Sequence, residues 1–232
     1  EFCPVVFTFR ADDAIENGIL NDYKIIVHEL ELSNDNNYQV KTKTKSFMSS
    51  ELKNYNYWGT RIDTAGGNVH MLRVMRMKAM MEYPSKERYA QVLFNDIVKR
   101  NNKCILFANT QNQADKMSQY SYHSKNIDSE QNLKDFKEGK INHLSCVLQL
   151  NEGVNIPELR QGIIMHAYGN ERKAAQRIGR LLRLNPDDQA IVHILCYKNT
   201  IDEKWVKDAL EFFDDNKIEW RNFLVSSDKL VY

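Results

Sequence analysis

Short apolar runs alternate with segments of helical character through the second half of the chain, and this alternation limits the available folds more than any other feature. The apolar runs lie at residues 104–108, 144–150, 162–167 and 190–196. Helical patterns lie at residues 112–120, 129–137, 171–183 and 202–213. Strands that are apolar throughout are buried on both faces, so the pattern predicts an α/β fold in which helices flank a parallel sheet on both sides. The loops after residues 108, 150 and 167 should then share the ligand-binding edge of the sheet.

The first hundred residues are less regular. Residues 25–27 predict a strand, and the alternation of lysine with threonine or valine over residues 38–46 predicts an exposed strand or edge hairpin. Residues 54–67 have the aromatic and polar composition of a loop or small insert. A methionine stripe at helical spacing predicts a helix from residue 69 that packs into the core and ends at Pro84, and residues 87–100 predict a second helix.

Charge is distributed unevenly along the chain. The net charge is only +1, yet residues 41–103 carry 13 basic and 5 acidic side chains, whereas residues 1–40 carry 2 basic and 8 acidic ones. A basic block of this size is suited to a polyphosphate ligand, and it is equally typical of a solvated, lysine-rich face. Charge alone leaves both interpretations open.

Cysteine usage and hydropathy indicate the compartment. Three of the four cysteines (Cys104, Cys146 and Cys196) lie inside apolar runs, which favours buried thiols over disulfides or zinc ligands. No apolar run approaches the roughly 18 residues that span a bilayer. Residues 1–4 lack the basic and then apolar plan of a signal peptide. We therefore expect a cytoplasmic protein without a membrane contact.

Paired arginines form the strongest chemical signal. Arg180 and Arg183 are three residues apart and share a helix face, while Gly179 permits the close approach of another surface. Two forked guanidinium groups suit an oxygen-rich anion such as a triphosphate. The alternative is a surface helix whose arginines pair with carboxylates.

Two further loops follow predicted buried strands. Residues 150–157 form a tight turn shaped by Gly153 and Pro157, and residues 107–110 are followed by a second polar segment at 123–125. Small polar groups and backbone amides at a strand end can bind phosphate oxygens. Ordinary turns between a strand and a helix have a similar composition, so neither loop is specific alone.

Taken in order, these segments resemble the second RecA-like domain of superfamily-two helicases and translocases, the DEAD/DEAH-type motors. Residues 176–183 are similar to the QxxGRxxR motif of that family, residues 152–157 to its EGxDxP-type motif, and residues 105–110 to the strand that opens the domain. Residues 200–203 resemble the closing helix of the DNA-directed branch. The resemblance implies a RecA-like domain at 85–232, the tail of a preceding motor domain and a linker at 1–37, and a basic segment or insert packing on the motor at 38–84.

The resemblance also implies that two domains together form the site of ATP hydrolysis. Neither GxxxxGK[ST] nor a DExD or DExH tetrad occurs in the chain, so ATP and Mg²⁺ are expected to be held mainly by a preceding RecA-like domain. Arg180 and Arg183 would act as arginine fingers that Gln176 orders. The nucleotide would be lined by Glu152, Gly153, Asn155 and Gly179. The chain alone is then expected not to hydrolyse ATP.

The expected partner is nucleic acid, and DNA more than RNA. The residues implied to contact its sugar-phosphate backbone are Asn109, Thr110, His123, Ser124, Lys125 and Gln149. The chain departs from the family at two points. Asn155 stands where Asp is common, which alters a contact to the ribose, and residues 149–151 lack the threonine often found there.

Three other interpretations compete with this resemblance. The chain could be a non-catalytic module that binds nucleic acid or a partner, which the departures at Gln149 and Asn155 favour. It could be the motor part of a restriction–modification subunit, which a nuclease domain in the same reading frame would decide. An ordinary Rossmann nucleotide binder needs GxGxxG after its first strand, and none is present.

Overall fold

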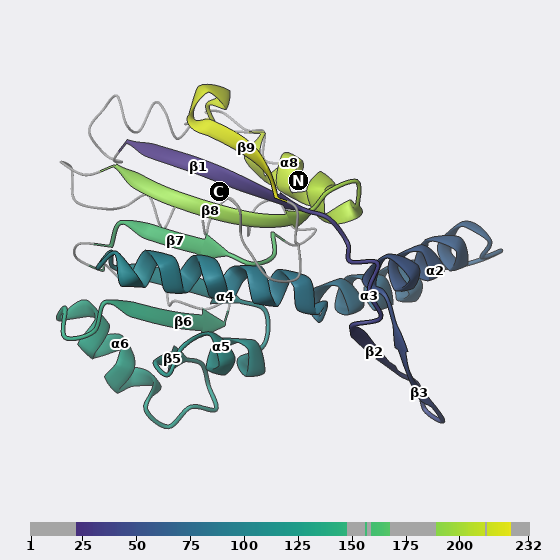
Figure 1. The fold of residues 1–232 in the computed structure, drawn as a ribbon, viewed down its shortest axis with the longest axis horizontal. Coiled ribbons are helices and arrows are strands. Elements are labelled where there is room, and N and C mark those ends of the chain that lie inside the picture. Colours follow the sequence, from purple (N-terminus) through teal and green to yellow (C-terminus); the bar gives the residue numbers. More distant parts are fainter. Residues whose placement is uncertain (1–21, 148–155, 157–158, 168–188, 212, 224–232) are drawn as a thin grey trace, which may run out of the picture.

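A seven-stranded, all-parallel sheet organises the molecule in the computed structural model, which describes residues 22–147, 156, 159–167, 189–211 and 213–223. The strand order is β5-β6-β4-β7-β8-β1-β9 (Figure 1). The strands are β1 (Tyr23–Leu30), β4 (Cys104–Ala108), β5 (Ser121–Tyr122), β6 (His143–Val147), β7 (Gln161–Ile164), β8 (Ala190–Tyr197) and β9 (Ile218–Phe223). The predicted α/β class with a parallel sheet is confirmed.

Helices cover both faces of this sheet. They are α4 (Pro84–Lys99) and α5 (Gln111–Met117) on one face and α6 (Ser129–Lys137) and α8 (Ile201–Leu210) on the other, with a 3₁₀ turn η1 (Asp215–Lys217) before β9. Successive residues of a strand point to opposite faces. Accordingly, Ile105 and Phe107 of β4 pack with α6 and α8, whereas Leu106 and Ala108 pack with α4 and α5.

Strand β1 lies between β8 and β9, although it precedes both by most of the chain. It pairs in parallel with β8, from Tyr23 opposite Ala190 to Leu30 opposite Tyr197, and with β9 on its other side. The division of the chain into 1–37, 38–84 and 85–232 stays a prediction. The structure adds that part of the first segment completes the sheet of the third.

Local sequence signals explain where most helices begin and end. Thr200 caps α8 by accepting a hydrogen bond from the amide of Asp202. Pro84 occupies the first turn of α4, where its missing N–H costs nothing, so this helix begins three residues earlier than residue 87. Gly139, at φ 74°, takes the left-handed conformation that ends α6 after Lys137.

Two expectations for the region before α4 were wrong. The composition of residues 54–67 predicts a loop or small insert, and the loop is wrong because helix α2 (Glu51–Asp63) covers most of them. The methionine stripe does lie on a helix, α3 (His70–Met81), but only its last turn reaches the core. Met80 is 2% exposed, whereas Met71 is 61% exposed, because the start of α3 lies beyond the sheet.

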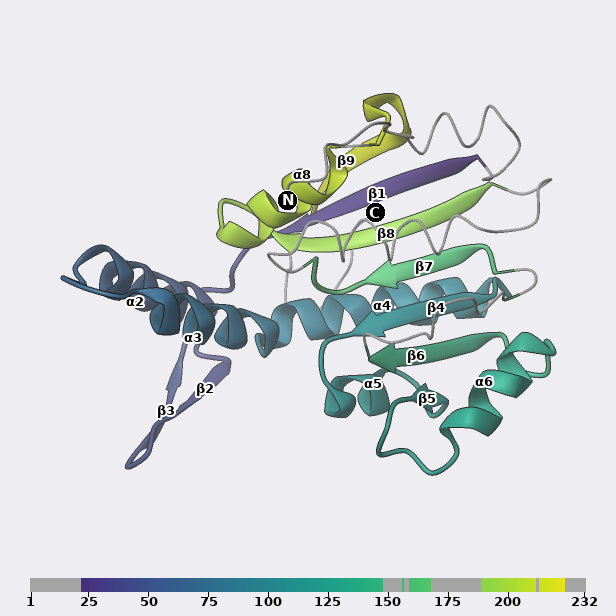
Figure 2. The same cartoon turned by 180° about the vertical axis from the view of Figure 1, so that it is seen from behind.

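A projecting arm is the most distinctive part of the shape. We define the arm as residues 38–81, which comprise β2 (Tyr38–Lys41), β3 (Ser46–Ser49), α2 and α3. Strands β2 and β3 form the antiparallel hairpin that the sequence predicts. Figures 1 and 2 show the arm extending from the side of the sheet to which the carboxyl ends of the strands point. Among the described residues, no helix is long and apolar enough to cross a membrane.

Candidate functional site

The carboxyl edge of the sheet presents two polar loops that come from neighbouring strands. Strand β4 ends at Ala108 and is followed by Asn109 and Thr110, and β5 ends at Tyr122 and is followed by residues 123–125. Strands β5 and β4 flank β6 on its two sides. The predicted nucleic-acid residues in the described part of the chain therefore lie at one edge of the sheet.

The first loop is held by the start of helix α5. The Thr110 side chain caps this helix by accepting a hydrogen bond from the amide of Gln113 at 3.2 Å. The Gln113 side-chain oxygen in turn accepts a hydrogen bond from the Asn109 amide at 3.2 Å, and its Nε2 donates to the carbonyl of Met81 at 2.6 Å. Because Gln113 is buried, it fixes this loop to the end of α3 while Thr110 stays exposed.

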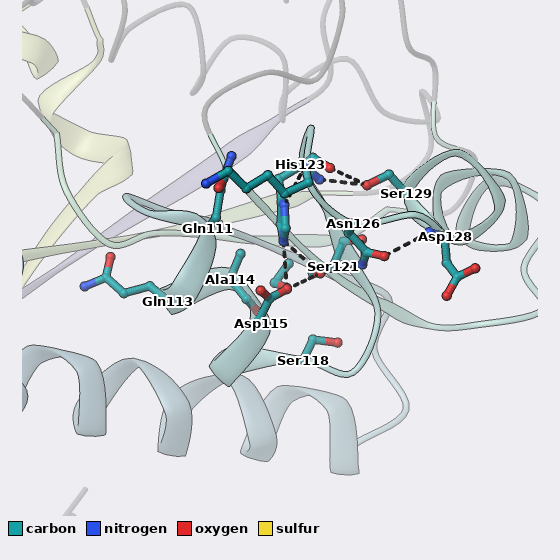
Figure 3. Close-up of polar contacts among 12 residues, drawn as sticks. Gln111, Gln113, Ala114, Asp115, Ser118, Ser121, His123, Asn126, Asp128 and Ser129 are labelled. Atoms are coloured by element: carbon teal, nitrogen blue, oxygen red, sulfur yellow. Dashed lines mark hydrogen bonds and ion pairs between the residues drawn. The ribbon is translucent and has the colours of Figure 1, made fainter.

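The second loop is built around the imidazole of His123. Its Nε2 lies 2.7 Å from Asp115 Oδ1, and the Ser121 hydroxyl donates to the same carboxylate oxygen at 2.6 Å (Figure 3). The Lys125 amide donates to His123 Nδ1 at 3.3 Å, so Nδ1 is the acceptor and Nε2 carries the proton given to Asp115. The His123 side chain is 4% exposed, and both ring nitrogens are engaged within the protein.

The charge of Asp115 completes this cluster. Partial burial raises the pKa of the Asp115 carboxyl, but the hydrogen bonds from Ser121 and His123 outweigh that effect and lower the pKa below its usual value. Asp115 therefore stays ionised and orients the ring of His123. His123 thus holds its own loop in place, and the next two residues, Ser124 and Lys125, face the solvent.

A second set of hydrogen bonds fixes the path of the same loop. Ser129, at the start of α6, accepts from the His123 amide at 3.0 Å and donates to the His123 carbonyl at 2.6 Å. Asn126 Nδ2 donates to the carbonyl of Ser121 at 3.0 Å (Figure 3). The loop is thereby closed around an ordered backbone, and Ser124 and Lys125 remain exposed at its tip.

One side-chain contact joins the two loops. Gln111, in the first turn of α5, donates through Nε2 to the Ser124 hydroxyl at 3.1 Å. Asn109 and Thr110 on one loop and Ser124 and Lys125 on the other therefore form one polar surface, which we call the edge platform. Its four members, of which Asn109 is half-buried and the other three are exposed, were predicted from sequence. Asp115, Ser121, Asn126 and Ser129, which hold the platform in place and carry no motif of their own, were not.

The nucleotide-facing predictions lie outside the described residues. These are Glu152, Gly153, Asn155, Gln176, Gly179, Arg180 and Arg183. Gln149, which the sequence predicts as a nucleic-acid contact, also lies outside the described residues. Within the described part of the chain, no group of three acidic, histidine or cysteine side chains could hold a metal ion. Cys104, Cys146 and Cys196 are buried, as their apolar surroundings predict.

A buried ion pair that the sequence did not reveal lies at the same edge. Lys86 Nζ, in the first turn of α4, pairs with the carboxylate of Asp202 at the start of α8, and the two side chains are 1% and 3% exposed. Asp202 also accepts from the Tyr197 amide at 3.0 Å. The pair joins two helices to the end of β8 and therefore makes the edge a single structural unit.

The fold defines a class of protein: the seven-stranded parallel sheet with helices on both faces is that of a RecA-like domain. The family model described as the helicase conserved C-terminal domain matches residues 85–185. These residues are therefore similar to the C-terminal RecA-like domain of superfamily-two helicases, which confirms the resemblance inferred from the motifs.

The comparisons with individual proteins agree with this assignment. The DNA 3'-5' translocase XPB2 of Sulfurisphaera tokodaii is 28% identical over 109 residues, which are 44% of this chain and 25% of that protein. The chain thus spans about a quarter of the curated relative that it matches.

Two solved structures share the fold at low identity. The ATP-dependent Type ISP restriction-modification enzyme LlaBIII bound to DNA is 13% identical, with a TM-score of 0.53 over 97% of this chain and 17% of that chain. The S. cerevisiae protein Dbp5 bound to RNA and ADP BeF3 is 11% identical, with a TM-score of 0.50 over 88% of this chain and 43% of that chain. Both likenesses concern the fold.

Proposed function

We propose that the chain is the C-terminal motor half of an ATP-dependent helicase or translocase that acts on DNA. The observation that carries the proposal is the edge platform, because it combines exposed hydroxyl and ammonium groups and a half-buried amide on loops whose backbone is fixed by buried hydrogen bonds. Such groups bind phosphate oxygens without reading bases. The name of the relative, a DNA translocase, supports DNA as the track.

Within this proposal, each residue of the platform has a distinct role. Ser124 and Lys125 contact the sugar-phosphate backbone from one loop, and Asn109 and Thr110 contact it from the other. His123 positions the loop through its bond to Asp115. Gln149 is proposed as a further contact on the basis of the sequence motif alone.

We assign nucleotide hydrolysis to the interface between this domain and a preceding RecA-like domain. ATP supplies the energy of the cycle, and Mg²⁺ neutralises its phosphates when both are bound, mainly by the preceding RecA-like domain. Arg180 and Arg183 are proposed as the arginine fingers and Gln176 as the residue that orders them, with Glu152, Gly153, Asn155 and Gly179 along the nucleotide. The 232-residue chain alone is accordingly proposed to be inactive in hydrolysis.

The platform is tested by binding of a fluorescent single-stranded oligonucleotide to the chain. The variant Ser124→Ala/Lys125→Ala should bind more weakly and should lower the salt slope of log Kobs by about 0.7 for the lost ammonium contact. Lys99→Ala, which removes an exposed lysine at the other end of α4, is the matched control and should bind as the parent does. Equal binding by the parent and the platform variant would refute the assignment.

The finger assignment is tested in the full-length protein. Arg180→Ala and Arg183→Ala should each reduce DNA-stimulated hydrolysis by about 10³-fold or more and leave DNA binding intact. Full turnover in both variants would reject the assignment. Hydrolysis by the purified 232-residue chain would contradict the division of the site between two domains.

A second candidate is the motor part of a restriction–modification enzyme, which the fold likeness to LlaBIII over 97% of this chain brings forward. The two candidates share the same motor chemistry and differ in what is attached to it. A nuclease or methyltransferase domain in the complete reading frame would select the second candidate, and its absence would remove it.

A further inference from the structure

We propose that the arm, residues 38–81, binds the phosphate backbone of duplex DNA through cations on helix α2 and on the β2–β3 hairpin. This surface is separate from the edge platform, which the proposed function assigns to a single strand. The inference rests on the proposed function in one respect: it requires that DNA lies along the carboxyl edge of the sheet.

The charge of the arm favours a polyanionic partner. The arm carries eight basic and two acidic side chains, and one of the acidic side chains, Glu51, is fully buried. Within the described part of the chain, no carboxylate pairs with any of the eight cations. The cations are Lys41, Lys43, Lys45, Lys53, Arg61, Arg73, Arg76 and Lys78. A concentration of uncompensated positive charge on one projecting element is the electrostatic pattern expected for nucleic-acid binding.

Helix α2 arranges part of this charge in a row. Lys53, Tyr57 and Arg61 are spaced four residues apart and are all exposed, so they follow one face of the helix. Eight residues of helix cover about 12 Å. One DNA strand presents three to four phosphates over about that distance along the duplex axis.

The guanidinium of Arg61 is held in place by an aromatic neighbour. Arg61 Nη1 donates to the Tyr57 hydroxyl at 3.0 Å, and the guanidinium carbon lies 5.8 Å from the centre of the Tyr57 ring. This contact leaves the other N–H groups of Arg61 available to a phosphate. It also reduces the conformational freedom that Arg61 would lose on binding.

The hairpin supplies the second group of cations. Lys43 and Lys45 lie in its turn, where Thr42 Oγ1 accepts from the Lys45 amide at 2.9 Å and donates to the Lys45 carbonyl at 2.9 Å. Every residue from 41 to 48 is exposed. A two-stranded ribbon fits the major groove of B-form DNA, and lysines at its tip would meet the flanking phosphates.

The base of the arm is fixed to the motor domain. Both carboxylate oxygens of Glu51 accept hydrogen bonds from Ser85 at the start of α4, at 2.8 Å from the amide and 2.6 Å from the hydroxyl. The Tyr55 hydroxyl accepts from the Ile201 amide at 3.0 Å, at the start of α8. Because α2 is tied to two helices at the carboxyl edge, DNA bound by the arm would be held at a defined angle to the edge platform.

A protein partner is the rival occupant, because helix α3 exposes Met71 and Met75. Exposed methionines suit an adaptable apolar contact. The cations on α2 and the hairpin, however, require a partner rich in negative charge, and DNA supplies that charge at regular spacing. The experiment below makes a protein partner one of the outcomes that would overturn the proposal.

The test compares two charge-neutralised versions of the 232-residue chain with the parent chain. The arm variant replaces four exposed cations of the hairpin and α2: Lys43→Gln, Lys45→Gln, Lys53→Gln and Arg61→Gln. The control variant removes four cations from the ends of α4 and α6, at the opposite edge of the sheet: Lys99→Gln, Arg100→Gln, Lys134→Gln and Lys137→Gln. Both variants have the same net charge. Thermal unfolding of all three proteins verifies that the fold is retained.

Binding of a fluorescent 20-base-pair duplex is measured from 50 to 200 mM salt. The slopes of log Kobs against log salt for the parent and the control variant should differ by less than about 0.9, the value of one phosphate contact. The slope of the arm variant should be smaller in magnitude by about 3.6, which corresponds to four lost phosphate contacts. An unchanged slope in the arm variant, or an equal loss in both variants, would overturn the proposal. So would a loss confined to a 20-nucleotide single strand. If a protein binds to the immobilised parent chain but not to the immobilised arm variant, and duplex binding is unchanged, the arm would be assigned to a protein partner.

The same samples separate this proposal from the proposed function. Loss of single-strand binding in the Ser124→Ala/Lys125→Ala variant reports on the edge platform. Loss of duplex binding in the arm variant reports on the arm. Either can fail while the other holds, so the two assignments are judged independently.

Discussion

Acid should destabilise this domain through a pair of buried histidines on the neighbouring strands β1 and β8. A hydrogen-bonded chain runs from the Tyr89 hydroxyl to His28 Nδ1 at 2.6 Å, from His28 Nε2 to His193 Nδ1 at 2.9 Å, and from His193 Nε2 to Gln161 Oε1 at 3.2 Å. The Gln161 oxygen can only accept, so with both rings neutral the protons point from Tyr89 towards Gln161. Protonating either ring would place a positive charge in a buried site.

The magnitude follows from the shifted pKa values. Burial, with the nearby charges of the other ring and Arg221, lowers the pKa of His28 to about 3, and burial and Arg221 lower that of His193 to about 4. Above pH 6.5 neither the folded nor the unfolded state is protonated at these sites, so the pair leaves stability unchanged. Below pH 6.5 the unfolded chain binds protons at these histidines and the folded chain does not. The free energy of unfolding therefore falls by about 1.4 kcal/mol per histidine for each pH unit. At pH 5 the two histidines together should remove roughly 4 kcal/mol.

Urea unfolding at pH 7 and pH 5 measures this loss. In His28→Leu/His193→Leu, the protein should be less stable at pH 7, but its change between the two pH values should be smaller than the parent's by roughly 4 kcal/mol. His70→Leu removes an exposed histidine and serves as the control, since its surroundings differ little between the two states. An identical pH dependence in the parent and the double variant would refute the reasoning.

Three further substitutions test the carboxyl edge by denaturant unfolding. Lys86→Met should lower the free energy of unfolding by about 3–5 kcal/mol because it leaves the charge of Asp202 buried and unpaired, and adding Asp202→Leu should restore part of the loss. Thr110→Ala should cost about 1 kcal/mol through the lost cap of α5, whereas Thr110→Ser should cost much less. Asp115→Ala should cost about 1–3 kcal/mol because His123 loses its acceptor, and single-strand binding should fall with it. A cost below about 0.5 kcal/mol in any of the three alanine or methionine variants would contradict the corresponding role.

The parts of the fold that were predictable are those that a local pattern determines. Helix α6 has the bounds expected from Ser129 and Gly139, and β4 has those of its apolar run. Helix α2 was missed because Asn54, Tyr55 and Gly59 are typical of loops, and the helix depends on a tertiary contact from Glu51 to Ser85. Hydrophobic periodicity cannot report such a contact.

The candidate site divides in the same way. Asn109 and Thr110 follow a predicted strand, so their location could be inferred from that pattern, whereas Ser124 and Lys125 follow the short strand β5, which was not predicted, and were found only through the family resemblance. The residues that hold the platform could not be inferred, because Asp115 and Ser121 reach His123 from a helix end and a two-residue strand. Neither element has a sequence pattern that indicates a functional role.

The position of β1 has a consequence for how the molecule forms. Tyr23 pairs with Ala190, 167 residues later in the chain, and β9 follows later still. During synthesis on the ribosome, an eight-residue strand that is almost entirely buried in the folded protein therefore emerges long before either of its neighbours exists. Such a segment must remain unpaired or be shielded by a chaperone until the last fifth of the chain appears, which makes closure of the sheet a late and slow event in folding.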